Sequence, residues 1–177
     1  GMVTTTLSNR HGDSAMLDFL GPSSARTLRR LSLDSVRPFP GPSRASLAGL
    51  LSLRVLYLKN MRCGNRLQTM FSDLPSLETV KLQGCFITCP NRSDFAGLTG
   101  LKYLNLGNTH VVDCPDNRLP NDLLAGLPAL VMADFGGMKV GNSADSTEMH
   151  GLSNQTFRDS SRHLRVLQLK RLRFTSG

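Results

Sequence analysis

The sequence predicts an α/β solenoid, a horseshoe in which about six short repeats stack and share one parallel sheet on the concave side. Three observations predict this fold: an apolar motif that recurs along the chain, an apolar series with a spacing of three before each motif, and one further apolar residue after it. Each repeat therefore points several apolar side chains the same way. No repeat can bury them alone, so stacking must form a continuous core.

The recurring motif is Leu-x-x-Leu-x-Leu, with other apolar residues at some positions. Its first residues lie 25, 24, 24, 29 and 34 positions apart, by subtraction of residue numbers. The alternation within each motif predicts a short strand, because side chains of a strand point to opposite faces in turn. The two long intervals predict loops with insertions. The six copies occupy residues 28–33, 53–58, 77–82, 101–106, 130–135 and 164–169.

The apolar series before the motifs predicts the convex side of the repeat. Phe71, Leu74 and Leu77 lie three residues apart, and three other repeats have the same spacing. A spacing of three predicts a turn of α-helix or 3₁₀-helix that leads into the strand. Beyond the strand, a third apolar position lies ten residues after the first leucine of the motif. It is occupied by Cys63, Ile87, Val111, Val140 and Phe174.

Composition and charge exclude several classes of protein. With 177 residues, 40% of them hydrophobic and 19% charged, the chain is of a size and composition that suit one globular domain and not a disordered or fibrous protein. No apolar run approaches the roughly 18 to 20 residues of a membrane-spanning helix, so we expect no membrane insertion. The formal net charge of +8 favours anionic partners, of which nucleic acid is one.

With these repeats, the sequence resembles the leucine-rich repeat family over about residues 17–174. We expect residues 17–177 to form the solenoid, and residues 1–16 to be disordered or part of an incomplete earlier repeat. Residues 95–106, 151–157 and 164–169 are similar to repeats of Toll-like receptor ectodomains. This resemblance implies a fragment that recognises a protein or another microbial ligand in innate immunity, with a receptor homodimer as one assembly. Two alternatives remain: an intracellular interaction scaffold, and a cell-surface adhesion or antigen-binding protein.

The sequence departs from the family in the turn after each strand. The family usually has an asparagine eight residues after the first leucine, and its side chain bonds to the backbone. This chain lacks it, although Asn60 and Asn108 lie one residue early, so the buried amides there need other partners. Cys85 is a replacement that the family is known to use. The residues found in this position are Val36, Met61, Cys85, Thr109, Met138 and Leu172.

Four cysteines permit three pairings if all are bridged. On the repeat frame, Cys89 and Cys114 occupy nearly the same position in adjacent repeats, and the spacing of stacked strands suits a disulfide. Cys63 and Cys85 fall at interior positions, which favours free thiols. Zinc bound by Cys85, Cys89, Cys114 and His110 is a less favoured alternative, because the spacing is not Cys-x-x-Cys. We therefore expect one disulfide and neither metal nor cofactor.

Two Asn-x-Ser/Thr sequons begin at Asn91 and Asn154. With the expected disulfide they favour the extracellular space or the endosomal lumen, as part of a larger protein. Reduced thiols and unmodified asparagines would instead indicate the cytoplasm.

The expected binding surface is the concave face, because outward residues of the strands combine aromatic and basic side chains there. The loop insertions at residues 113–120 and 141–148 are further candidates. No sequence pattern of a hydrolase, kinase or dinucleotide-binding site is present, so we expect no enzymatic activity. The expected ligand-binding residues are Tyr57, Lys59, Lys81, Gln83, Tyr103 and Asn105.

Overall fold

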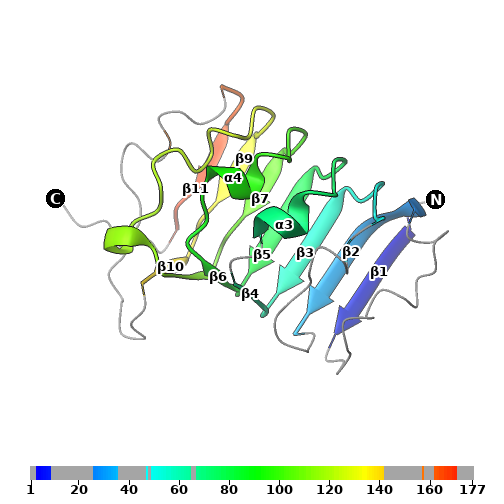
Figure 1. Cartoon of the computed structure of the whole chain (residues 1–177), viewed down its shortest axis with the longest axis horizontal. Coiled ribbons are helices and arrows are strands. Elements are labelled where there is room, and N and C mark those ends of the chain that lie inside the picture. Colours follow the sequence, from blue (N-terminus) through cyan, green and yellow to red (C-terminus); the bar gives the residue numbers. More distant parts are fainter. Residues whose placement is uncertain are drawn as a thin grey trace.

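The computed structural model describes residues 3–8, 26–35, 47, 49–64, 67–141, 157 and 162–170. Its larger sheet has seven strands, which are parallel in every pairing. Figure 1 shows them side by side, with β1 and β11 at opposite ends of the array. In spatial order they are β1 (Val3–Ser8), β2 (Leu28–Asp34), β3 (Val55–Lys59), β5 (Thr79–Gln83), β7 (Tyr103–Asn105), β9 (Met132–Asp134) and β11 (Val166–Gln168).

The strands form where the sequence motif alternates. In β2, Leu28, Leu31 and Leu33 are fully buried, whereas Arg30 between them is exposed. Neighbouring motifs pair in register, with Leu31 opposite Leu56 and Leu56 opposite Val80. Each leucine therefore packs on its equivalent in the next repeat, and the predicted solenoid with a parallel sheet is confirmed.

β1 lies before the first recognised motif and within residues 1–16. It pairs with β2 so that Thr5 stands opposite Leu31 and Leu7 opposite Leu33. A threonine thus occupies the place of the central leucine, which is why the motif does not reveal this strand. The sheet consequently has one strand more than the six motifs predict.

A chain of short backbone turns leads into the strands. The amide of Leu74 donates to the carbonyl of Phe71, and the amide of Leu77 donates to the carbonyl of Leu74. The same pairs occur before β3, β7 and β9. Bonds from residue i to i−3 align side chains three positions apart, so the apolar series faces the core as predicted.

Two short helices, α3 (Leu67–Phe71) and α4 (Arg92–Phe95), lie before these turns in their repeats. Their last residues pack together, with the ring centroids of Phe71 and Phe95 6.0 Å apart. Both side chains are buried.

A second parallel sheet follows the first along one side of the solenoid, and sequence reasoning did not predict it. Its spatial order is β10-β8-β6-β4. The third apolar position lies within each strand, and Cys63, Ile87, Val111 and Val140 are all buried. The sequence thus predicted the apolar position but not the hydrogen-bonded strand around it. The strands are β4 (Arg62–Gly64), β6 (Phe86–Thr88), β8 (His110–Val112) and β10 (Lys139–Val140), and the 3₁₀ turn η2 (Pro115–Asn117) follows β8.

The residue seven positions after the first leucine adopts a left-handed backbone conformation in the five motifs for which the structure describes it, the first of them at Ser35. Asn60 and Asn108 have φ values of 53° and 55°, and Gly84 and Gly137 have values of 66° and 70°. Glycine and asparagine tolerate this region best. A Cβ atom on Gly84 would lie 2.6 Å from Oδ1 of Asn60, so this glycine is also required by its neighbour. Asn60 and Asn108 therefore serve the turn itself.

Two side chains replace the family's asparagine in the next position. Sγ of Cys85 lies 3.3 Å from the carbonyl oxygen of Leu58, to which it donates. The Thr109 hydroxyl donates to the carbonyl of Leu82. Each bond reaches the last motif residue of the preceding repeat. A thiol and a hydroxyl thus provide the expected backbone partners in these turns.

The cysteines are arranged as the repeat frame predicts. Cys89 and Cys114 form a disulfide with a Cα–Cα distance of 4.7 Å. Cys63 and Cys85 are buried free thiols. The hydrogen bond with Cys85 and burial both raise the pKa of Cys63, which keeps its thiol protonated at neutral pH. Because the sulfur atoms of Cys89 and Cys114 are bonded to each other, they are not thiolate ligands for zinc. The alternative metal site therefore loses two of its four ligands.

No helix in the described part of the chain is long and apolar enough to cross a bilayer.

Thr109→Val should destabilise the protein by about 1 to 3 kcal/mol, because the buried carbonyl of Leu82 loses its hydroxyl donor. Thr109→Ser keeps the hydroxyl and should cost about 1 kcal/mol or less for the lost methyl group. Urea unfolding measures both changes. Equal stability of Thr109→Val and the native chain would contradict the role of this bond.

Replacing Cys89 and Cys114 together by serine should lower the free energy of unfolding by roughly 3 kcal/mol, the loop entropy for a separation of 25 residues. Denaturant unfolding with and without reductant measures this change. Reduction should destabilise the native chain by a similar amount and leave the double variant unchanged. A large effect of reductant on the double variant would show that another disulfide carries the stability.

Candidate functional site

The outward side chains of the larger sheet form three rows that cross the strands, and together they make the concave face. The first row is Thr4, Arg30, Val55, Thr79, Tyr103, Met132 and Val166. The second row is Thr6, Ser32, Tyr57, Lys81, Asn105, Asp134 and Gln168. The third row is Asp34, Lys59 and Gln83, near the ends of the strands.

A hollow of about 490 Å³ lies over the first and second rows. Arg30 and Lys81 supply its two cations, and none of its lining residues is acidic. Tyr57 and Tyr103 add aromatic rings, and hydroxyl groups account for most of its remaining polar atoms. Its lining residues are Thr4, Thr6, Arg30, Ser32, Val55, Tyr57, Thr79, Lys81 and Tyr103. The hollow is therefore basic and rich in hydrogen-bond donors.

Contacts between strands hold the polar side chains beside this hollow. Nζ of Lys81 lies 5.2 Å from the ring centroid of Tyr103, at the distance of a cation–π contact. Nδ2 of Asn105 lies 3.1 Å from the Tyr103 hydroxyl and 2.9 Å from Oδ2 of Asp134. The hydroxyl of Tyr57 donates to Oε1 of Gln83. These contacts limit the conformations of both tyrosines.

The third row has a different electrostatic character, because its lysine is paired. Nζ of Lys59 lies 3.1 Å from Oδ2 of Asp34. Burial alone would raise the pKa of Asp34, but hydrogen bonds from Lys59, Ser35 and Asn60 together lower it. The hydrogen bond and the charge of Asp34 raise the pKa of Lys59. The two charges largely cancel at neutral pH, so this end of the sheet adds little positive potential.

The structure divides the six expected ligand-binding residues into three groups. Tyr57, Lys81 and Tyr103 line the hollow. Gln83 and Asn105 bond to the tyrosine hydroxyls, and Lys59 pairs with Asp34. Their role in binding stays a prediction.

Arg30, Ser32, Val55 and Thr79 also line the hollow, and their strand positions could have identified them. Thr4 and Thr6 could not be found this way, since β1 lacks the motif.

The sequon at Asn91 lies at an exposed helix start. Asn91 caps α4, and its Oδ1 accepts a hydrogen bond of 2.8 Å from the amide of Ser93. The backbone amide of Asn91 donates to Oδ2 of Asp94 at 2.7 Å, which completes a capping box. Because the oxygen of the side chain serves the cap, this geometry leaves Nδ2 as the atom for a glycan. Asn154 lies outside the described residues. Residues 142–148 of the second insertion lie outside them as well.

Across the ranges that the structure describes, no three His, Cys, Asp or Glu side chains gather as metal ligands. His110 contacts the backbone, with Nε2 3.0 Å from the carbonyl oxygen of Gly141.

No family model matches the sequence, and no curated protein matches it significantly. Among solved structures, TLR13 in the TLR13–ssRNA13 complex is similar, with 22% identity and a TM-score of 0.54 over 85% of this chain. An internalin (inlF) from Listeria monocytogenes has 14% identity and a TM-score of 0.44 over 96% of this chain. The chain spans 23% of that TLR13 chain and 54% of that internalin chain. With the parallel sheet and the recurring motif, the likeness to TLR13 identifies the fold of this chain as a leucine-rich repeat solenoid.

Proposed function

We propose that the chain is a non-catalytic recognition fragment of a Toll-like receptor type of ectodomain, and that the hollow on its concave face binds an anionic ligand. The observation that carries this proposal is the charge of the hollow. Arg30 and Lys81 line it, whereas the acids of the concave face, Asp34 and Asp134, lie outside it. Both acids have hydrogen-bond donors of the chain as partners.

The hollow suits an anionic group for a second reason. Hydroxyl and cationic donors come from neighbouring strands, so one anion can contact several of them at once. Lys81 already contacts Tyr103, and Tyr103 contacts Asn105, so binding needs little ordering of these side chains. Pre-ordered donors cost less conformational entropy when a ligand binds. The hollow therefore favours phosphate or carboxylate groups over neutral ligands.

Single-stranded nucleic acid is the ligand class that we propose first. Such ligands bind where cations follow the backbone and aromatic rings stack on bases. Tyr57 and Tyr103 offer rings beside Lys81, and the net charge of +8 would speed the encounter. TLR13, which has a similar fold, was solved as a complex with ssRNA13. A protein ligand with an acidic surface is the alternative that the same charges allow.

The proposed location is the extracellular space or the endosomal lumen. The Cys89–Cys114 disulfide supports it, because such bonds persist mainly in oxidising compartments. The exposed sequon at Asn91 supports it independently.

Binding of a fluorescent short single-stranded RNA, measured by anisotropy, tests the concave site. Affinity should fall steeply between about 50 and 200 mM salt, as expected when phosphates are neutralised. Arg30→Gln and Lys81→Gln should each weaken binding, with a smaller salt slope by about one. Lys139→Gln, an exposed cation on β10, is the matched control. A flat salt response, or equal losses in all three variants, would refute a nucleic-acid site in this hollow.

Secretion of the chain from eukaryotic cells should place a glycan on Asn91. Ser93→Ala removes the sequon but keeps the backbone amide that bonds to Asn91, so the glycan should be lost while the helix cap remains. Ser93→Thr retains the sequon and should remain glycosylated. Peptide mass spectrometry measures the occupancy. An unmodified Asn91 in secreted native protein would count against this site.

A further inference from the structure

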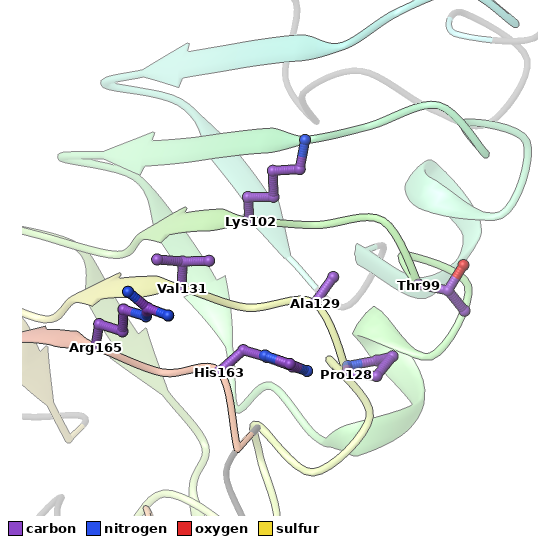
Figure 2. Close-up of a pocket in the computed structure, with 7 residues that line it drawn as sticks. All are labelled: Thr99, Lys102, Pro128, Ala129, Val131, His163 and Arg165. Carbon is purple, nitrogen blue, oxygen red and sulfur yellow. The ribbon is translucent and has the colours of Figure 1, made fainter.

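A second hollow lies where the chain enters β7, β9 and β11. Its volume is about 540 Å³, and its lining residues are Thr99, Lys102, Pro128, Ala129, Val131, His163 and Arg165. We name it the flank pocket. Figure 2 shows Val131 and Arg165 close together, with the ring of His163 extending toward Pro128. Three neighbouring repeats contribute to it, and none of its residues belongs to the concave hollow.

The frame of the flank pocket is a ladder of backbone hydrogen bonds between equivalent residues. The amide of Val131 donates to the carbonyl of Lys102 at 2.9 Å, and the amide of Arg165 donates to the carbonyl of Val131 at 2.8 Å. The same ladder continues through Glu78 and Arg54. These residues form one row, the strand-start row, which holds their side chains at fixed spacing.

Glu78 lies between two cations of the strand-start row and pairs with both. One carboxylate oxygen of Glu78 lies 3.1 Å from Nη1 of Arg54, and the other lies 3.0 Å from Nζ of Lys102. The hydrogen bond from Lys102 and the charges of Lys102 and Arg54 lower the pKa of Glu78. A single acid thus satisfies the cation on either side of it.

Val131 occupies the next position of the row, after Lys102. Val131 is 37% exposed and offers Arg165 no charge. Within the described part of the chain, no carboxylate forms a salt bridge with Arg165. Val131, Pro128 and Ala129 instead form an apolar floor beside this arginine. The position between Lys102 and Arg165 in the row is therefore apolar and open to solvent.

We propose that the flank pocket docks an acidic peptide segment of a partner protein, in which a large apolar side chain covers Val131 and a carboxylate pairs with Arg165. Arginine and carboxylate form strong two-point pairs, and a buried apolar anchor often dominates an interface. The partner's acid would pair with Arg165 as Glu78 pairs with Arg54 and Lys102.

The exposure of the pocket favours a peptide on a protein surface over a small molecule. All lining residues except Ala129 are exposed. Small-molecule sites usually enclose most of their ligand, whereas this hollow can cover only one side of it. A second copy of this chain is disfavoured because each copy carries a net charge of +8.

The probe for this proposal is a fluorescein-labelled peptide Asp-Glu-Phe-Glu-Asp, with affinity measured by anisotropy. One control peptide has alanine in place of phenylalanine, and the other has amides in place of the carboxylates. Only the first peptide should bind well. Val131→Glu should weaken its binding by about tenfold or more, since the new carboxylate supplies Arg165 from within the chain and removes the anchor site. Arg165→Gln should have a similar effect.

The chain offers matched controls for both variants. Val166→Glu places the same charge at another exposed valine, 40% exposed on the concave face, and Lys139→Gln removes a cation from β10. Both should bind the peptide nearly as well as the native chain. Circular dichroism verifies folding, and Arg165→Met, which also removes the charge, replaces Arg165→Gln if that variant does not fold.

Nuclear magnetic resonance locates the peptide. The amides of Ala129, Val131 and Arg165 should shift, and those of Arg30 and Lys81 should not. Three results would overturn the proposal: no peptide binding, equal losses in pocket and control variants, or shifts confined to the concave face. Self-association that Val131→Glu abolishes would identify a second copy as the occupant instead. The proposed function is tested separately by measuring RNA binding to Val131→Gln, because this substitution leaves the concave hollow unchanged.

Discussion

No single repeat of this chain can bury its own leucines, so every other feature depends on neighbouring repeats stacking in one register. Leu31, Leu56 and Val80 are fully buried only because each lies opposite its equivalent. A shift by one residue would exchange the buried and exposed faces of a strand. The same register aligns the outward side chains, and thereby creates the rows of the concave face. The core and the concave face are two results of one constraint.

The turns after the strands show how this register is maintained where the motif ends. Asn60, Gly84, Asn108 and Gly137 permit the left-handed backbone, and in two of these turns the next side chain bonds back to the preceding repeat. Cys85 and Thr109 make that bond with different chemical groups. A short polar donor makes this bond where one is present, whereas Met61 and Met138 fill the same position with a buried apolar side chain. There is also a steric reason for glycine at position 84, because the side-chain amide of Asn60 fills the space that a Cβ atom of Gly84 would occupy.

Sequence reasoning predicted the features that repeat and missed those that arise between repeats. The leucine motif predicts the strands because burial alternates along each one, and the repeat frame brings Cys89 and Cys114 together. It missed β1, where Thr5 replaces the central leucine, and the second sheet, whose strands have only one buried side chain each. The concave site was predicted in part, since Tyr57, Lys81 and Tyr103 line the hollow. The flank pocket was missed because its lining residues stand beside the first leucine of each motif, where the motif does not specify the side chain.

The unequal repeats have a consequence for how this surface can diversify. The intervals of 29 and 34 residues enlarge the connections around β9 and β11, yet both strands pair in register with the shorter repeats. The added residues therefore leave the strand pairing unchanged. Substitution at outward strand positions can alter the concave face, while insertion and deletion can reshape the flank. Changes on either surface can therefore occur while the buried leucines stay the same. A single solenoid could in this way acquire a second binding specificity and keep the first.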